Sequence, residues 1–367
     1  MSTAMSQSFT AFFTEELMTE EIEVLDDTTM SYSFEWSWKH VSWSWWQILQ
    51  LIFAMVGVIG NLLVILVLFR WRRRRCSTDT LIAGLAVADL MTSIFVIPHD
   101  EIDTLPNTPL GQLYCRVVHS SVLMWTSICA SIFTLTTISV ERLMAIRYPF
   151  TYQRLFTAHR STIALGFIWV LAFVVNTYSL YITYIQEGAC IVRFPSPTFQ
   201  KVVGVALFLI EYVVPVIVMI FAHILTIRSL RVRTQNLTSG TEQQKHALKL
   251  LTARRRVIRL LLIVIVTFVI CWTPDQLGFL AFNVGLVHYT HLYSPLYRVF
   301  VVLAFANSCV NPIIYASRNP NFRRAVKDLC GGVSNIGLQS VFGGIDDSRT
   351  ADATDITELP SIAKPRE

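Results

Sequence analysis

The sequence contains little charge for a chain of its length. Of its 367 residues, 15% are charged and 53% are hydrophobic, and the mean hydropathy is +0.51. A soluble chain with two or three cores does not need so apolar a composition, so these values indicate a membrane protein. Residues 1–40 also lack a basic start followed by an apolar core. We therefore expect no cleavable signal peptide, and the first membrane span should act as its own signal.

Patterns that mark other functional classes are missing as well. The sequence shows no nucleophile–base pair and no metal-ligand constellation, so we expect no enzymatic activity. Internal repeats and pore-facing charges are also lacking, which leaves an ion channel or a transporter as a remote alternative. The net charge of +5 comes mostly from loop arginines, so it does not indicate nucleic acid as a partner.

Seven stretches are long and apolar enough to cross a bilayer as helices. They are residues 44–69, 79–98, 113–140, 162–185, 201–227, 256–284 and 294–316. Basic residues gather in the loops after the first, third and fifth stretches, which places these loops in the cytoplasm and the N-terminus outside. The predicted fold class is therefore an all-α membrane protein, a seven-transmembrane helix bundle that passes several times through the plasma membrane.

The two ends of the chain differ from this membrane domain, which we place at residues 44–330. Residues 1–43 are acidic and should be a flexible extracellular segment ending in an aromatic belt. The alternation of these aromatics with serine resembles a strand, but their place before the first span favours the belt. Residues 319–330 predict a short amphipathic helix on the membrane surface, with Cys330 placed for palmitoylation and contact with membrane lipid. Residues 331–367 should form a flexible cytoplasmic tail.

Ionisable residues interrupt three of the apolar stretches. Asp89, Glu211 and Asp275 each lie within a span, where an isolated carboxylate is costly and needs partners or a water-filled cavity. Two cysteines, Cys115 and Cys190, lie at the outer ends of their spans. Because that side faces an oxidising compartment, we expect a disulfide between them.

Eight motifs in order resemble the rhodopsin-like (class A) G-protein-coupled receptors, and general likeness favours the neuropeptide-receptor branch. They are Gly60-Asn61, the LAVAD run ending at Asp89, the pair Cys115 and Cys190, Glu141-Arg142-Leu143, Trp169, Pro215, the CWTP run ending at Pro274, and the NPIIY run from Asn311 to Tyr315. The resemblance covers residues 45–330. It implies that an extracellular ligand activates a heterotrimeric G protein, and that phosphorylated serines and threonines of the tail recruit arrestin.

The resemblance also implies a role for individual residues. Glu141 would hold Arg142 in the resting state, and Pro149 with Phe150 would contact the G protein. Four oxygen-bearing side chains would form an allosteric sodium pocket, the only metal or cofactor that we expect: Asp89, Ser131, Asn307 and Asn311. The other members of the activation switch would be Ile132, Pro215, His223, Phe268, Pro274 and Tyr315.

Several features depart from the family pattern, and two of them bear on the predicted site residues. His223 stands where tyrosine is usual, which puts its hydrogen bond to Tyr315 in doubt. The distance from Cys115 to Arg142 is longer than usual by about two residues, or half a helical turn. This surplus must lie between Cys115 and Ser131, so the register of the upper third span stays open.

The ligand is predicted from charges in the outer half of the bundle. Phe305 replaces the lysine that would bind retinal, and the third span has no aspartate of the kind that binds amines. The expected pocket consists of Glu211, Asp275, Gln276, Trp272, Met124, Phe279 and Arg298. Its two carboxylates favour a cationic ligand group, and hence a basic or amidated neuropeptide. The alternatives are a small cationic amine, or a carboxylate that is protonated or paired with His119 or Arg298.

Overall fold

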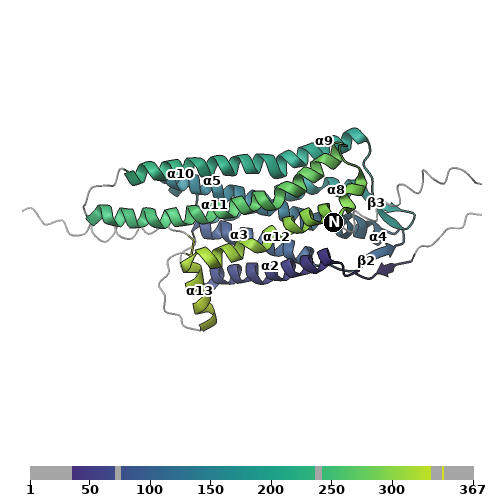
Figure 1. Cartoon of the computed structure of the whole chain (residues 1–367), viewed down its shortest axis with the longest axis horizontal. Helices are drawn as coiled ribbons and strands as arrows, with labels where there is room; N and C mark the ends of the chain where they lie inside the picture. The colour runs from purple at the N-terminus through teal and green to yellow at the C-terminus, as the bar shows by residue number, and fades with distance from the viewer. Residues whose placement is uncertain (1–34, 71–75, 236–241, 332–340, 343–367) are drawn as a thin grey trace, which may run out of the picture.

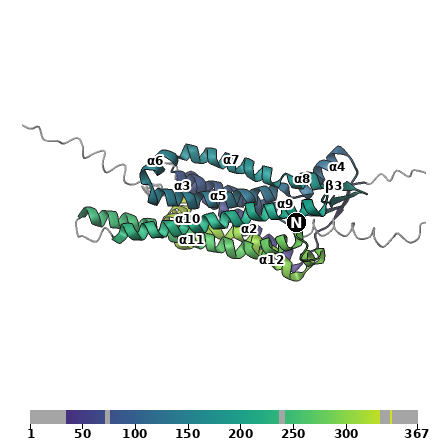
Figure 2. The same cartoon turned by 90° about the horizontal axis from the view of Figure 1, so that it is seen from above.

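The computed structural model describes residues 35–70, 76–235, 242–331 and 341–342, and the spans run side by side along its long axis (Figures 1 and 2). The seven spans are Trp45–Arg70, Ser77–Phe95, Pro109–Arg147, Ala158–Ile182, Pro197–Val232, Arg255–Asn283 and Pro295–Arg318. An amphipathic helix, α13 (Pro320–Gly331), follows the seventh span. The predicted fold class is thus confirmed, including the short helix after span seven.

The spans are built from the following helices. They are α2 (Trp45–Arg70), α3 (Ser77–Phe95), α4 (Pro109–Tyr114), the π-helix η1 (Cys115–His119), α5 (Val122–Arg147), α7 (Ala158–Asn176), α8 (Tyr178–Ile182), α9 (Pro197–Leu207), the π-helix η2 (Phe208–Val213), α10 (Val214–Gln235), α11 (Glu242–Asn283) and α12 (Pro295–Arg318). Short helices α6 (Pro149–Leu155) and η3 (Tyr289–Tyr293) lie in the connections. The helix α5 packs against α3, α7 and α10, so the third span is the central one.

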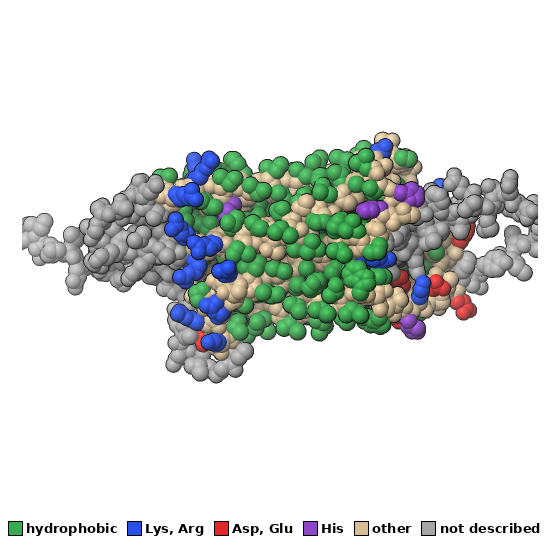
Figure 3. All heavy atoms as spheres, in the orientation of Figure 1, with side chains coloured by type: hydrophobic (Ala, Val, Ile, Leu, Met, Phe, Trp, Pro, Cys, Tyr) green, Lys and Arg blue, Asp and Glu red, His purple; other side chains and the backbone are tan. Residues whose placement is uncertain are grey.

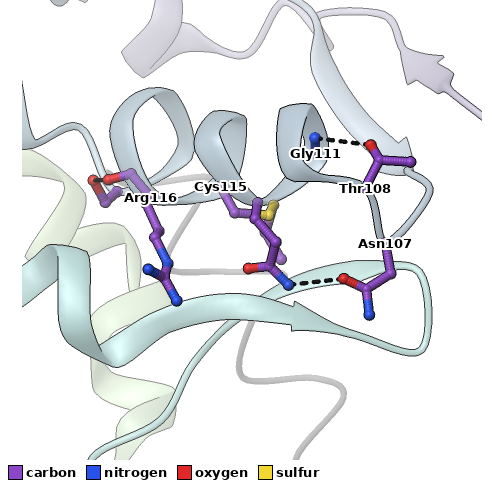
Figure 4. The surroundings of a disulfide bond; sticks show 8 residues. Asn107, Thr108, Gly111, Cys115 and Arg116 are labelled. Atoms are coloured by element: carbon purple, nitrogen blue, oxygen red, sulfur yellow. Dashed lines mark hydrogen bonds between the residues drawn. A yellow bond between two sulfur atoms is a disulfide. The ribbon is translucent and has the colours of Figure 1, made fainter.

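Several helices extend beyond the apolar stretches that predicted them. The described residues between the predicted stretches 201–227 and 256–284 are helical, because α10 ends at Gln235 and α11 begins at Glu242. Hydropathy marks the part of a helix that suits lipid, whereas the helix itself ends where its caps lie. Three spans begin with a hydroxyl cap followed by proline, and in the third span the Thr108 side chain accepts from the Gly111 amide (Figure 4).

Large apolar side chains cover the middle part of the molecule, between its two ends, as Figure 3 shows in green. Ile59, Phe167 and Phe221 are exposed by 63%, 71% and 63%. Soluble proteins rarely expose such a surface, whereas lipid would cover it. Lys and Arg side chains gather at one end, where α13 begins, and we call this the basic end (Figure 3). The opposite end carries acidic side chains and the hairpin of β3 (Thr183–Gln186) and β4 (Ala189–Val192), and we call it the hairpin end.

The predicted aromatic belt is wrong for part of the N-terminal segment. Strand β1 (Ser37–Lys39) pairs antiparallel with β2 (Glu101–Thr104), between the second and third spans. The Trp36 and Trp38 rings stack at 6.5 Å, and each meets the Tyr114 ring edge-on. The alternation with serine thus forms a strand because a partner strand and a ring to cover lie nearby.

The β1–β2 pair is anchored by the carboxylate of Asp100. Its two oxygens bind the Val41 amide and the His40 ring, each at 3.0 Å. The Val41 hydrogen bond and then His40 hold the pKa of Asp100 below its ordinary value. A carboxylate with a lowered folded pKa stabilises the pairing above its unfolded pKa of about 3.9 and loses this effect as the pH falls through the folded pKa.

Replacing Asp100 by asparagine should therefore loosen β1 at neutral pH. We expect faster hydrogen exchange at residues 37–41, corrected for the intrinsic rate, while the wild type keeps its protection from pH 7 to about pH 5. Asp103→Asn on the same strand is the matched control and should exchange like the wild type. Equal exchange in Asp100→Asn and the wild type would rule out this anchor.

Two residues of the predicted flexible tail are also packed against the bundle. Val341 and Phe342 are buried, with exposures of 3% and 2%. The tail prediction is wrong at this point because composition measures average polarity and does not register two apolar side chains with a matching site.

The surplus in the third span is accommodated near its start. Five residues form η1, in which Ser120 donates its amide to the Cys115 carbonyl five positions back. Ser121 then has φ 55°, in the left-handed region. A π-helical turn takes in one extra residue, and the left-handed residue breaks the helix before α5 begins at Val122. The additional residues therefore shift the helical register before α5 begins. The family motifs within α5 keep their alignment.

Candidate functional site

An inner cavity of about 750 Å³ lies among the third to seventh spans. Its lining includes five of the predicted pocket residues: Glu211, Trp272, Asp275, Gln276 and Phe279. The π-helix η2 carries Glu211, and α11 carries the other four. Charged side chains in apolar helices face the bundle interior because lipid would be far more costly.

Neutral side chains bind both carboxylates of this cavity. The Asn176 amide donates to Glu211 Oε1 at 3.2 Å, and the Cys129 thiol also hydrogen-bonds Glu211. The Tyr297 hydroxyl hydrogen-bonds Asp275. Within the described part of the chain neither carboxylate forms an ion pair, and the cavity lining contains no lysine or arginine. The site thus carries acidic groups without a basic partner from the receptor.

Two predicted pocket residues lie elsewhere. Arg298 does not line the inner cavity, and its guanidinium lies 3.9 Å from the centre of the Trp46 ring, on the first span. Met124 lines a separate space of about 730 Å³ with Gln47 of the first span. Its neighbour Trp125 lines the inner cavity instead. Both residues belong to α5, so this exchange depends on which face of α5 turns toward the cavity and not on the additional residues before Val122.

A second cavity of about 650 Å³ continues the inner one toward the hairpin end. Four side chains line both spaces: Trp125, Tyr178, Leu207 and Phe279. The outer wall includes Thr183 and Val192 from the antiparallel strands β3 (Thr183–Gln186) and β4 (Ala189–Val192). The two cavities are therefore adjacent, with the hairpin in the wall of the outer one, and we refer to the pair as the groove.

A disulfide holds this hairpin in place. Cys190 of β4 is joined to Cys115, with their Cα atoms 5.5 Å apart, as expected from their position at the outer ends of the spans. Figure 4 shows this bond beside the helical turns that begin with Thr108. Because Cys115 begins η1, the disulfide also fixes the hairpin relative to the third span. The predicted pairing is confirmed.

A buried polar cluster surrounds Asp89 in the middle of the bundle. The Ser131 hydroxyl donates to Asp89 Oδ1 at 2.7 Å, and the Asn311 amide donates to Oδ2 at 2.8 Å. Ser308, which the sequence did not single out, also hydrogen-bonds Asp89. Asn307 is buried on the same helix, but no hydrogen bond joins it to Asp89 among the described residues. Three of the four predicted sodium-pocket residues are thus in direct contact.

Near the basic end, Glu141 and Arg142 form a buried ion pair. The guanidinium binds both carboxylate oxygens, from Nε at 2.5 Å and from Nη2 at 2.7 Å. The Thr78 and Tyr152 hydroxyls donate to Glu141 Oε1 at 2.8 and 2.9 Å. Glu141 and Arg142 are 0% and 4% exposed. The sequence predicted the pair, but it did not indicate the two hydroxyl donors.

The other predicted switch residues lie along the bundle core. Ile132, Phe268 and Tyr315 belong to the main hydrophobic cluster, and Pro215 and His223 are also buried. Pro274 lies inside α11. The His223 Nε2 and Tyr315 hydroxyl atoms have no hydrogen-bond partner among the described residues. Pro149 begins α6, and the following Phe150 is 88% exposed at the basic end.

Comparison with known proteins places this architecture in a family. A family model described as 7 transmembrane receptor (rhodopsin family) matches residues 60–315. Similar proteins include galanin receptor type 2 of Rattus norvegicus, which is 29% identical over 85% of each chain. Galanin receptor type 2 of Homo sapiens is 31% identical over 78% of this chain and 73% of its own length, and galanin receptor 2a of Danio rerio is 31% identical over 80% and 81%. These are relatives from the neuropeptide-receptor branch. The chain belongs to the rhodopsin family of seven-transmembrane receptors and is a multi-pass G-protein-coupled receptor of the plasma membrane.

Proposed function

We propose that this receptor binds an extracellular peptide through a basic or amidated group of the ligand and then activates a heterotrimeric G protein. The observation that carries the proposal is the pair of carboxylates, Glu211 and Asp275, in one cavity without a lining lysine or arginine. A cationic ligand group would supply the missing charge in a site of low polarity, where a charge-assisted hydrogen bond is strong.

The shape of the groove favours a peptide over a small amine. The inner cavity of about 750 Å³ continues into the outer one of about 650 Å³. A small amine that contacts both carboxylates would occupy the inner cavity and leave the outer one unused. An extended peptide would occupy both. The galanin receptors among the relatives support the same choice.

We further propose that the hairpin end faces the outside, with residues 1–43 as an extracellular segment. The clustering of arginine and lysine at the opposite end supports this orientation (Figure 3). The predicted palmitoylation site, the side chain of Cys330, lies outside the described residues. The predicted arrestin-recruiting sites lie outside them as well, namely Ser348, Thr350, Thr354, Thr357 and Ser361. We keep both as proposals, together with a membrane-surface position of α13.

The proposed activation path runs from the groove to the ion pair. A ligand bound at Asp275 would contact α11 one turn from Trp272, whose side chain lines the same cavity. Movement of the sixth span about Pro274 would then open the basic end and free Arg142 to meet the G protein, with Phe150 as a further contact. The carboxylate and hydroxyl oxygens of Asp89 and Ser131 suit a sodium ion, which would stabilise the resting arrangement.

Replacing Asp275 by asparagine should reduce the potency of the native peptide about 10- to 100-fold, because a charged hydrogen bond contributes about 1.5–3 kcal/mol. The measurement is G-protein activation in cells, screened with basic and amidated peptides beside biogenic amines. The surface amount of each receptor variant is measured in parallel. Asparagine can still accept a hydrogen bond from Tyr297, so the change removes the charge and little of the volume.

Gln276→Glu is the matched control, since it adds a carboxylate one position away in the same cavity lining. It should keep or increase the potency of a basic peptide. A peptide response unchanged in both Asp275→Asn and Glu211→Gln would contradict the carboxylate site. A response to amines alone would replace the peptide by a small cationic amine and leave the receptor family unaffected.

A further inference from the structure

The basic end of the bundle contains a site that is filled by the chain's own tail. Val341 and Phe342 are 3% and 2% exposed and belong to the main hydrophobic cluster. Phe342 is the only aromatic residue after residue 331. A largely polar tail that buries its single aromatic side chain makes a specific contact with the helix bundle.

The Phe342 ring contacts two aromatic rings of the bundle. Its centroid lies 5.0 Å from that of Tyr315 at an interplanar angle of 68°, and 6.0 Å from that of Phe322 at 40°. Inclined arrangements of this kind are preferred by aromatic pairs. Tyr315 belongs to α12 and Phe322 to α13, so one tail side chain bridges the seventh span and the helix that follows it.

The peptide unit between Val341 and Phe342 is hydrogen-bonded on both sides. The Phe342 amide donates to Asp79 Oδ1 at 3.1 Å, and the Asn319 side-chain amide donates to the Val341 carbonyl at 3.2 Å. A buried peptide unit needs partners for both of its polar groups, and here the bundle supplies both. The site therefore recognises the backbone as well as the ring.

This site lies next to two parts of the activation switch. Asp79 directly follows Thr78, whose hydroxyl binds Glu141 of the buried ion pair at 2.8 Å. Tyr315 has a buried hydroxyl without a partner among the described residues, while its ring contacts Phe322 and Phe342. The position of Tyr315 is thus held by ring packing, and Phe342 supplies part of that packing.

We propose that Val341 and Phe342 form a tethered plug. The site made by Asp79, Tyr315, Asn319 and Phe322 binds an aliphatic–aromatic dipeptide, and its occupation by the tail holds the resting conformation and lowers basal G-protein activation. Displacement of the tail frees Tyr315 to move and uncovers this part of the basic end. The proposal rests on G-protein coupling and is independent of the ligand proposed above.

Because the plug is covalently attached to the receptor, a contact of low affinity is enough to keep its site filled. Residues 332–340 join α13 to the plug, and a short linker gives an effective concentration in the millimolar range. A dipeptide with low affinity would thus fill the site in the intact chain, yet a docking G protein could displace it. The same argument sets the concentration at which a free peptide should act.

The test uses full-length receptor in nanodiscs with purified G protein and measures nucleotide exchange without agonist. Phe342→Ala should raise the exchange rate about fivefold, because the resting state loses the burial of one aromatic ring. Ile356→Ala removes another apolar side chain of the same tail and should exchange at the wild-type rate. The acetylated, amidated tetrapeptide Ser-Val-Phe-Gly, at about millimolar concentration, should return Phe342→Ala toward the wild-type rate. Ser-Val-Ala-Gly should have no effect.

Binding of the fluorescent Ser-Val-Phe-Gly peptide, measured without G protein, keeps the test independent of coupling. It should bind Phe342→Ala more strongly than the wild type, whose own tail competes. An unchanged exchange rate in Phe342→Ala, or a raised rate that neither peptide lowers, would overturn the plug. Peptide binding that is equal in both receptors would overturn it as well. If no variant supports exchange but the binding difference is present, the dipeptide site stands and G-protein coupling is what has failed.

Discussion

Glu141→Ala should raise agonist-independent G-protein activation about tenfold or more. In the described structure Glu141 accepts hydrogen bonds from Arg142, Thr78 and Tyr152, and it is fully buried. Removing one partner of a buried ion pair costs about 3–5 kcal/mol, since the other charge stays without compensation. If about 1.4 kcal/mol of this cost falls on the resting conformation alone, the active population rises tenfold.

The neighbours of Glu141 provide graded controls. Thr78→Val and Tyr152→Phe each remove one neutral donor and leave the ion pair intact, at a cost of about 1 kcal/mol. Their basal activation should rise about twofold to fivefold, well below that of Glu141→Ala. The measurement is nucleotide exchange at matched surface amounts of receptor. A Glu141→Ala receptor that reaches the surface, responds to agonist and shows wild-type basal activity would contradict the resting role of this pair.

The sequence predicted the structure best where the membrane limits which backbone structures and side-chain orientations are possible. Spans such as α2 must be helical and apolar for more than twenty residues, and a carboxylate such as Glu211 must face the interior. Both properties can be read from single stretches of sequence. The disulfide between Cys115 and Cys190 followed from a similar restriction, because the oxidising side offered these two thiols.

The structure was less predictable where the outcome depends on a distant partner. Strand β1 forms because β2 and Tyr114 lie beside it, and the plug residue Phe342 is buried because Tyr315 and Phe322 offer it a site. The length of the third span revealed about two extra residues, but not that η1 and Ser121 would take them up.

Neutral hydrogen-bond donors were also missed. Asn176 and Tyr297 bind the two carboxylates of the inner cavity, and Thr78 binds Glu141. A neutral polar side chain is tolerated in a span far more readily than a charge, so its presence in the sequence is a weak signal. Only the structure shows which of these side chains meet a carboxylate.

Replacing Cys115 and Cys190 together by serine should abolish the ligand response and reduce the surface amount severalfold. The bond joins residues 75 positions apart, and the chain-entropy estimate for a loop of this length is about 4 kcal/mol. This value is an upper limit here, because helices that are already inserted in the membrane leave the open chain less freedom. The larger loss concerns the groove, since β3 and β4 form its outer wall and the disulfide alone ties β4 covalently to η1.

This disulfide effect can be separated from a general loss of packing by a second cysteine change. Cys309→Ser is the matched control: Cys309 is buried and unbridged, and its thiol donates to the Ala306 carbonyl at 3.0 Å, a bond that serine can keep. The control should retain the wild-type surface amount and agonist potency. Thermal unfolding of purified receptor in nanodiscs should show a lower Tm for the double variant only. A double variant with wild-type potency would mean that the hairpin keeps its place through β3–β4 and its contacts with the spans alone, and the groove would then not depend on the covalent tie.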